Sequence, residues 1–222
     1  MPSDHHHVLG RVWQATAADA QAAIDHALGA ARQWAELSFD DRAAIFLRAA
    51  DLIAGPYRAR INAATMLGQG KTVQQAEIDA ACELVDFLRF NVSFARQIHA
   101  EQPLSAPGTW NQMDYRPLEG FVYAITPFNF TAIGGNLPTA PAIMGNVALW
   151  KPALTQQLAA DVFFEVLEQA GLPSGVITMV PGHGSEVSQV ALTHPALAGI
   201  HFTGSTRVFQ QLWQQVGQNI AT

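Results

Sequence analysis

Four short loops hold the side chains in this sequence that are best suited to bind a ligand. Each loop follows a short apolar run and combines Pro or Gly with a hydroxyl, amide or ammonium group. The loops are residues 126–130, 151–152, 181–185 and 202–206. In an open parallel sheet, ligands bind beyond the carboxyl ends of the strands, so we look for the binding residues in these loops.

Gly204 and Ser205 are candidates for binding a phosphate group. They lie where a loop turns into a helix, so backbone N–H groups, a hydroxyl and the helix dipole could meet a phosphate there. This arrangement suits a dinucleotide. In the alternative interpretation, Thr203 and Ser205 only cap the next helix. Lys151 is also open to two interpretations, because a lysine at a strand end could donate to ribose hydroxyls or be an ordinary surface residue.

Two glycine-containing segments are weaker candidates. Gly182 and Gly184 begin a G-x-G-x-x-G dinucleotide pattern, but Val187 takes the place of the third glycine. The segment at 68–72, Gly-Gln-Gly-Lys-Thr, is similar to part of an ATP-binding phosphate loop, yet Thr65 stands where that pattern needs glycine. A helix end followed by a turn explains this segment better.

The helix predicted to follow carries polar side chains with several possible roles. Asp79, Glu83 and Asp86 recur at three- and four-residue steps and could mark a polar site, although a solvated helix face is the default. Cys82 lies among apolar neighbours and is predicted to be a packing residue with an unactivated thiol. The histidines at 5–7 suit a tag remnant, a metal-binding tract or a polar arm, and no ligand cluster follows that would predict a metal site.

The first half of the chain is predicted to be helical. Across residues 17–100, apolar residues recur at three- and four-residue steps, and a Gly-Pro pair at 55–56 ends one helix. A second break lies at 68–70, and a long helix begins at about Thr72. The apolar stripe of this long helix is predicted to comprise Val73, Ala76, Ala80, Leu84, Phe87, Asn91 and Ile98.

The second half is predicted to alternate strands with helices. Residues 103–118, interrupted by three prolines, suit a projecting hairpin or flap. Short apolar runs then occur at 121–126, 147–151, 176–180 and 198–202, each followed by Pro or Gly and a segment of helical length. The sequence therefore predicts an α/β fold in which a helical amino-terminal layer and a projecting β flap accompany a parallel sheet with helices on both faces.

Composition limits the kind of protein. The chain has 222 residues, enough for one large domain or one domain with appendages, and its 49% hydrophobic and 14% charged residues suggest extensive burial. A net charge of −6 without a basic run argues against a nucleic-acid partner. A single cysteine fits a reducing compartment, and no apolar run reaches membrane-spanning length. We expect a cytoplasmic protein without membrane contact, or a mitochondrial-matrix protein if the source is a eukaryote.

Taken in order, the loops resemble segments of the aldehyde dehydrogenase family. The family segments P-[WF]-N-F, K-P and F-T-G-S are similar to residues 127–130, 151–152 and 202–205. The resemblance covers nearly the whole chain, and it is finer to the branch that oxidises L-glutamate γ-semialdehyde (1-pyrroline-5-carboxylate). The segments that carry this finer resemblance are residues 69–72, 76–81, 90–91, 119–121 and 131–136.

The resemblance implies a Rossmann-like NAD-binding fold and covalent catalysis. In the family, a Cys thiolate attacks the aldehyde, hydride passes to NAD, and water activated by a Glu hydrolyses the thioester. Asn129 matches the Asn whose amide holds the developing oxyanion, and Phe130 matches a position that shapes the substrate pocket. The positions that match NAD contacts are Thr126, Pro127, Lys151, Gly204, Ser205, Thr206, Arg207 and Val208.

The resemblance also implies a domain organisation and an assembly. Residues 1–102 are expected to form the helical part of the cofactor-binding domain, residues 103–119 an oligomerisation flap, and residues 120–222 the Rossmann-like NAD-binding part. Family members oligomerise through such a flap. We therefore expect a homo-oligomer that acts on a small aldehyde with NAD and without a metal.

Two departures from the family pattern leave alternatives open. Leu154 stands where many relatives have an acidic residue that holds the ribose hydroxyls, so the choice between NAD and NADP is open. The nucleophilic Cys and the general-base Glu are expected beyond Thr222, so this chain alone is expected to lack activity. The alternatives are a non-catalytic NAD-binding or assembly module, and another superfamily member such as a CoA-dependent or phosphate-forming enzyme.

Overall fold

A parallel sheet of four strands lies at the centre of the protein, in a computed structural model that describes residues 1–219. The strands are β1 (Phe121–Ile125), β2 (Val147–Lys151), β3 (Ile177–Met179) and β4 (Leu197–Phe202). Their order across the sheet is β3-β2-β1-β4, and every neighbouring pair is parallel. The predicted strands and the predicted α/β class are therefore confirmed.

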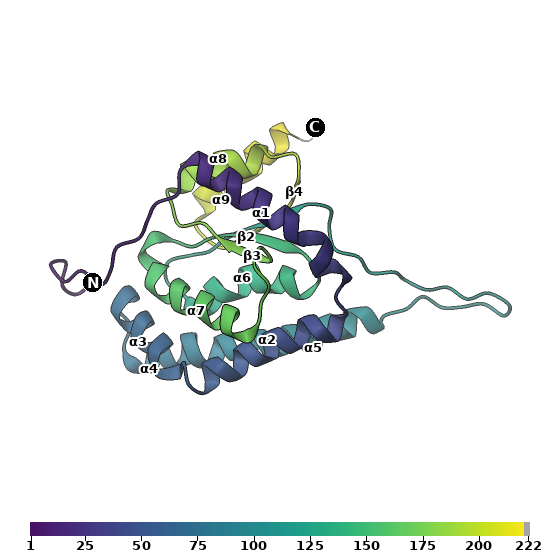
Figure 1. Cartoon of the computed structure of the whole chain (residues 1–222), viewed down its shortest axis with the longest axis horizontal. Coiled ribbons are helices and arrows are strands. Elements are labelled where there is room, and N and C mark those ends of the chain that lie inside the picture. Colours follow the sequence, from purple (N-terminus) through teal and green to yellow (C-terminus); the bar gives the residue numbers. More distant parts are fainter. Residues whose placement is uncertain (220–222) are drawn as a thin grey trace.

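Helices cover both faces of this sheet (Figure 1). On one face, α6 (Thr131–Ile143) connects β1 to β2, and α7 (Gln157–Ala170) connects β2 to β3. On the other face, α8 (Gly184–Thr193) leads from β3 across the sheet to β4, and α9 (Thr206–Gln218) follows β4. All of β1 and most of β2 are buried, as expected for parallel strands that are covered on both sides.

The helical amino-terminal half is divided between the two faces. Helix α1 (Ala17–Glu36) packs against α8 and the strands, on the face opposite α6 and α7. Helices α2 (Phe39–Ala54), α3 (Arg58–Gln69) and α5 (Leu84–Ala100) lie over α6 and α7 as an outer layer (Figure 1). The predicted helical layer is therefore built by the helices after α1, whereas α1 completes the other side of the sheet.

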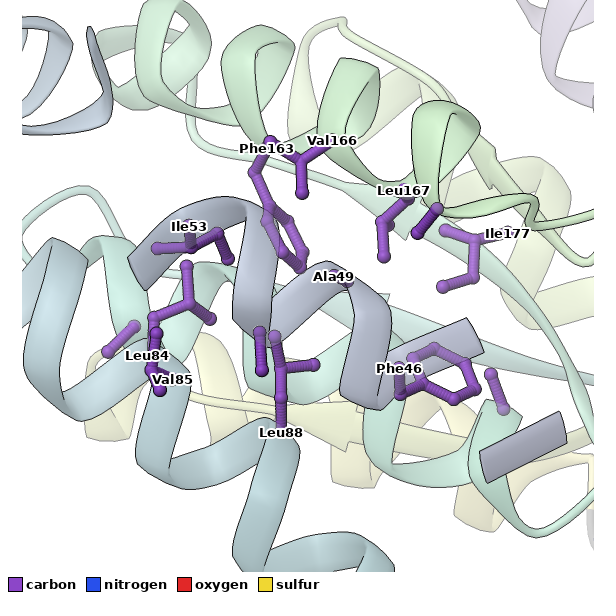
Figure 2. Close-up of a cluster of buried hydrophobic side chains, with 14 of the residues drawn as sticks. Phe46, Ala49, Ile53, Leu84, Val85, Leu88, Phe163, Val166, Leu167 and Ile177 are labelled. Carbon is purple, nitrogen blue, oxygen red and sulfur yellow. The ribbon is translucent and has the colours of Figure 1, made fainter. Parts of the chain in front are cut away.

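Two apolar cores lie on opposite sides of the sheet. The larger core fills the space between α2, α5, α6, α7 and the strands, and Figure 2 shows Phe46 of α2, Leu88 of α5 and Phe163 of α7 within it. The smaller core lies under α1 and α8 and contains Ile24 of α1. Trp34, near the end of α1, belongs to the larger core, so α1 joins the two.

The long helix predicted from Thr72 contains a π-helical turn. The short helix α4 (Val73–Ala76) begins after Thr72, and the π-helical residues Glu77–Glu83 lead from it into α5. Because a π-turn holds one residue more than an α-turn, it shifts the buried face of the following helix by about one position. The buried residues of α5 are Leu84, Val85, Leu88, Val92 and Ala95. The predicted stripe is confirmed at Ala76, Ala80 and Leu84 but is wrong after Leu84, because Phe87 and Asn91 each precede a buried residue by one position and Ile98 is exposed.

The predicted helix ends at 55–56 and 68–70 are both present. Helix α2 ends directly before Gly55, and α3 ends directly before Gly70. The φ angle of Gly70 is 68°, a left-handed conformation that favours glycine at a helix end. The segment at 68–72 is therefore a helix end and a turn, as predicted, and not a phosphate loop that follows a strand.

Residues 103–119 project from the body of the protein as a long, narrow loop (Figure 1). The predicted flap is present, but no strand is assigned to these residues, so the prediction that it is a β structure is corrected. Side chains join the two arms: Asn111 Nδ2 donates to the carbonyl of Leu104 at 2.9 Å, and the N–H of Met113 donates to Gln102 Oε1 at 2.8 Å. Prolines remove ladder donors, and an isolated two-stranded ribbon is only marginally stable.

Candidate functional site

A cleft of about 680 Å³ opens at the carboxyl edge of the sheet. It is bounded by the loops after β1, β2 and β4 and by helices α8 and α9. The predicted site residues that line this cleft are Thr126, Pro127, Lys151, Gly204, Ser205 and Val208. Two further predicted contacts, Thr206 and Arg207, lie in the first turn of α9 and are not among the residues that line the cleft.

The cleft lies where the connections of the sheet diverge. From β1 the chain crosses to β2 and then to β3, whereas β4 lies on the opposite side of β1. Connections that leave in opposite directions keep a crevice open between the loops at the carboxyl ends of two neighbouring strands. This topology explains why loops that are far apart in the sequence line one cleft.

The start of α9 presents a positively polarised end to the cleft. Ser205 is the N-cap, and its Oγ accepts a hydrogen bond from the N–H of Val208 at 3.3 Å, so Ser205 caps α9 and also lies at the edge of the cleft. The N–H groups of Thr206 and Arg207 have no acceptor within the helix and lie at the positive end of its dipole, where anions bind. A Cβ on Gly204 would lie 2.5 Å from the Phe202 ring, so a larger residue here would have to displace that ring.

Lys151 brings a positive charge into the cleft at the end of β2. Among residues 1–219, no carboxylate and no hydrogen-bond acceptor pairs with its ammonium group. Burial lowers the pKa of Lys151, because the charged amine loses hydration there and gains no counter-ion. A charge that is desolvated and unpaired costs stability, so Lys151 is available to donate to a group bound in this cleft.

The start of α8 also faces the cleft. Gly184 and Ser185 line it, and the N-cap residue His183 makes no side-chain capping bond. Val187, at the position of the missing third glycine, is fully buried, and its Cγ2 lies 3.2 Å from where a Cβ on Gly182 would be. The incomplete glycine pattern therefore still ends at a second helix N-terminus beside the cleft, with apolar packing in place of the third glycine.

The sequence analysis missed four polar residues of the cleft, which lie on helix faces. They are Ser188 and Gln189 of α8, and Gln211 and Gln215 of α9. A polar residue in the middle of a helix belongs to no motif, and the only available signal was the four-residue spacing of Ser185 with Gln189 and of Gln211 with Gln215. Tyr123 of β1 has its Oη 3.0 Å from Ser188 Oγ, and burial raises the pKa of Tyr123 to about 12, so the phenol is protonated at neutral pH.

The loop after β1 carries the predicted substrate-facing residues. Thr126 at its start is buried and accepts a hydrogen bond from Trp150 Nε1 at 3.1 Å. Asn129 is exposed, and its side chain makes no hydrogen bond within the part of the chain that the structure describes. Phe130 precedes α6 and is 39% exposed, and Lys71 Nζ lies 4.3 Å from the centre of its ring.

Two predictions for the helix after Thr72 are wrong. Asp79 does not lie on a solvated face, because it is 2% exposed and accepts from Lys71 Nζ at 2.5 Å. Cys82 is not a packing residue, because it is exposed, with its Sγ 3.7 Å from Arg58 Nη2. Both residues lie in the π-helical turn, where side chains do not follow the α-helical spacing that the predictions used.

No acidic residue of the described chain lines the cleft. Leu154, which replaces the acidic residue of many relatives, begins a short 3₁₀ helix (Leu154–Gln156) and does not line this cleft. It faces a second cleft, of about 560 Å³, that runs along the amino-terminal arm and includes His5 and His7. The lining of the first cleft therefore includes the ammonium group of Lys151 and no carboxylate from the described chain.

Comparisons with known proteins agree with this geometry. The model of the aldehyde dehydrogenase family matches residues 1–222. The chain is 52% identical to the probable delta-1-pyrroline-5-carboxylate dehydrogenase of Schizosaccharomyces pombe. The match covers 99% of this chain and 40% of that protein. It is also 52% identical to the mitochondrial delta-1-pyrroline-5-carboxylate dehydrogenase of Bos taurus, of which it covers 39%.

Solved structures are similar over the same part of the chain. The delta-pyrroline-5-carboxylate dehydrogenase from Mycobacterium tuberculosis, solved with NAD bound, is 66% identical and superposes with a TM-score of 0.95. The match covers 96% of this chain and 40% of that one. The chain thus spans about two fifths of the length of the relatives that it matches.

Proposed function

Because the chain belongs to the aldehyde dehydrogenase family, we propose that it forms the NAD-binding part of an enzyme that oxidises L-glutamate γ-semialdehyde (1-pyrroline-5-carboxylate) to L-glutamate. The names of the relatives support this substrate, and the NAD in the mycobacterial structure supports this cofactor. Since the relatives are longer, the proposal assigns the nucleophilic Cys and the general-base Glu to the part of the enzyme that this chain does not cover.

The observation that carries the proposal is the unpaired ammonium group of Lys151 beside two helix N-termini. A dinucleotide has a diphosphate that suits the starts of α8 and α9, including Ser205 and the N–H groups of Thr206 and Arg207. Its ribose hydroxyls can accept from Lys151. The apolar lining that Val208 contributes suits a flat ring, so the residues present fit the cofactor.

Asn129 and Phe130 are proposed to act on the substrate. When a thiolate sulfur bonds to the aldehyde carbon, the electron pair of the C=O π bond moves to the oxygen, and the side-chain N–H of Asn129 donates to that oxyanion. Phe130 contributes an apolar wall to the aldehyde pocket. NAD, when bound, supplies the oxidant that takes up the hydride from the substrate carbon.

We propose that the enzyme is a homo-oligomer joined through the flap at residues 103–119. This segment projects from the body, and its backbone groups lack ladder partners that a strand of another subunit can provide. The proposed organisation has a helical part at 1–102, the flap, and the NAD-binding part from residue 120 onward. No helix within residues 1–219 is long and apolar enough to cross a membrane. A cytoplasmic location is proposed, or the mitochondrial matrix if the source is a eukaryote.

Calorimetric titration with NAD and with NADP tests the cofactor proposal. We expect the chain to bind NAD and Ser205→Ala to weaken binding about threefold to tenfold, the scale of one lost hydrogen bond. The matched control is Ser38→Ala, because Ser38 is also an N-cap, accepts from the N–H of Asp41 at 3.1 Å and lies at the start of α2. Both variants lose about 1 kcal/mol of stability, but only one contacts the proposed site. Equal affinity losses in the two variants, or no NAD binding by a folded sample, would contradict the proposal.

A non-catalytic NAD-binding or assembly module is the alternative, and the projecting flap favours it. Both functions predict NAD binding, so the deciding measurement is NADH formation by the complete natural protein that contains this chain, with the semialdehyde as substrate. Turnover supports the dehydrogenase. NAD binding without turnover supports the module.

A further inference from the structure

A buried ion pair lies beneath the loop that carries Asn129. The side chains of Lys71 and Asp79 are 15% and 3% exposed, and Lys71 Nζ lies 2.5 Å from Asp79 Oδ2. Lys71 follows the end of α3, and Asp79 lies in the π-helical turn. Burying two charges is costly unless further hydrogen bonds satisfy them, so the remaining partners of this pair show what it does.

Asp79 caps α6 from another part of the chain. Its Oδ2 accepts from the N–H of Thr131 at 2.9 Å, and its Oδ1 accepts from the N–H of Ala132 at 2.8 Å. Phe130 occupies the N-cap position of α6 but offers no side-chain acceptor. The first two N–H groups of the helix are therefore satisfied by a carboxylate about fifty residues away, where its charge also complements the helix dipole.

Further polar contacts hold the same three residues. Gln156 Nε2 donates to the carbonyl of Phe130 at 2.6 Å, and Gln69 Nε2 donates to Thr131 Oγ1 at 2.7 Å. Lys71 Nζ, while paired with Asp79, also lies 4.3 Å from the centre of the Phe130 ring. Residues 130–132 are thus fixed by α3, the π-helical turn and the 3₁₀ helix, directly after an Asn129 that has no hydrogen bond of its own in the described chain.

We propose that Asp79, held by Lys71, is a positioning residue for the oxyanion donor Asn129. This inference rests on the proposed function of the loop. Donors to an oxyanion stabilise the transition state only if they are aimed before the reaction begins. The direction of an exposed side chain on a loop depends on the conformation of the backbone next to it. Asp79 holds the backbone after Asn129 by accepting from the N–H groups of Thr131 and Ala132. Asp79 lies in the π-helical turn, which places its carboxylate at the start of α6.

The test uses Asp79→Asn in the complete natural protein that contains this chain. The amide keeps the size of the side chain but loses the charge and one of the two acceptors. Hydrogen exchange at the N–H groups of Thr131 and Ala132 should become about tenfold faster. The kcat should fall about tenfold to 100-fold, as a misplacement of about 1 Å produces, while the Kd for NAD stays within about twofold.

Two further variants make the test decisive. Glu77→Gln is the control, because Glu77 lies in the same π-helical turn and pairs with Arg58 but does not contact residues 130–132; both readouts should stay at wild-type values. Lys71→Met leaves the Asp79 carboxylate in place but removes its counter-ion, so it should also lower kcat. If Asp79→Asn does not fold, the kcat of Lys71→Met decides the test.

The outcomes separate this inference from the proposed function. An inactive wild-type protein contradicts the proposed function, whereas unchanged exchange in Asp79→Asn contradicts the capping contact itself. Faster exchange with an unchanged kcat in an active enzyme overturns the positioning role, as does an equal loss of kcat in Glu77→Gln. A loss of NAD affinity that matches the loss of kcat also overturns it, because the effect then belongs to the whole fold.

Discussion

At the scale of single residues, the site depends on two buried or partly buried charges, those of Lys151 and Asp79. Lys151 has no partner within residues 1–219, whereas Asp79, which is also shielded from water, is paired with Lys71 and with two backbone donors. An unpaired, desolvated lysine such as Lys151 lowers the stability of the folded protein, so stability does not explain its presence. This contrast supports the proposal that Lys151 binds the cofactor and that Asp79 holds the backbone beside the site.

Replacing Lys151 therefore separates stability from binding. We expect Lys151→Met to raise the free energy of unfolding at pH 7 by about 1 kcal/mol, because a desolvated, unpaired group is removed, and to weaken NAD binding about tenfold. Chemical denaturation and calorimetric titration measure the two effects. A variant that is less stable than wild type, or that binds NAD equally well, would show that Lys151 has a packing role only.

The stability gain in Lys151→Met has a defined pH dependence. Burial lowers the pKa of Lys151 from its ordinary value of 10.5, so folding disfavours its charged form. The cost is fully present below the lowered pKa of the folded state, decreases as the pH rises through that pKa, and is absent above 10.5, where the amine is neutral in both states. The difference between variant and wild type should thus shrink in alkaline solution and be constant around neutrality.

At the scale of elements, the π-helical turn Glu77–Glu83 determines which face of α5 is buried. An extra residue in a helical turn can be removed while the helices on both sides keep their places, because the remaining turn becomes α-helical. At Phe87 and Asn91 the predicted stripe, which assumed an unbroken α-helix, is offset by one position from the buried residues Leu88 and Val92. This offset is the expected signature of a single inserted residue.

Deleting Cys82 should therefore be tolerated better than a deletion elsewhere in the continuous helix from Val73 to Ala100. Cys82 is exposed, and we expect its deletion to change the free energy of unfolding by about 1 kcal/mol. The control is deletion of Phe90, which is also exposed, at 55%, but lies within the α-helical part of α5. Removing one residue there rotates the following residues, Val92 and Ala95 among them, by about 100° and turns them away from the core. We expect that deletion to cost about 3 kcal/mol or more. Equal costs in chemical denaturation would mean that the π-turn does not contain the extra residue.

At the scale of the whole molecule, α1 connects the two cores on opposite faces of the sheet. Ile24 packs in the smaller core, while Trp34 packs in the larger one, edge to face with Phe46, and donates from Nε1 to the carbonyl of Ala142 at 2.9 Å. A helix anchored in both cores couples their stability. The described chain should consequently unfold in one cooperative transition.

Trp34→Ala tests this coupling. We expect it to lower the free energy of unfolding by about 3 to 5 kcal/mol and to leave a single transition, monitored by both circular dichroism and calorimetry. Trp213→Ala is the control, because Trp213 is 71% exposed and its removal should change the stability by about 0.5 kcal/mol or less. Two separated transitions in the Trp34 variant would show that the cores fold independently.

The sequence predicted the strands and their loops well because the signals are local. Apolar runs that end in Pro or Gly reveal strands without knowledge of their neighbours, and the residues after them, such as Lys151 and Ser205, lie at the cleft because parallel strands end at one edge. The helix ends at Gly55 and Gly70 were also predictable, because left-handed or broken backbone at a helix end favours glycine.

The sequence by itself thus determined the α/β class, the order of strands and helices along the chain, and the loops that border the cleft. Only the tertiary structure decided that α1 crosses to the other face, that Asp79 is buried while Cys82 is exposed, and that Lys151 has no counter-ion within residues 1–219. The burial of Asp79 and the exposure of Cys82 depend on a π-turn that shifts helix faces without a local motif. The other features depend on contacts between residues that are far apart in the sequence, which no local pattern encodes.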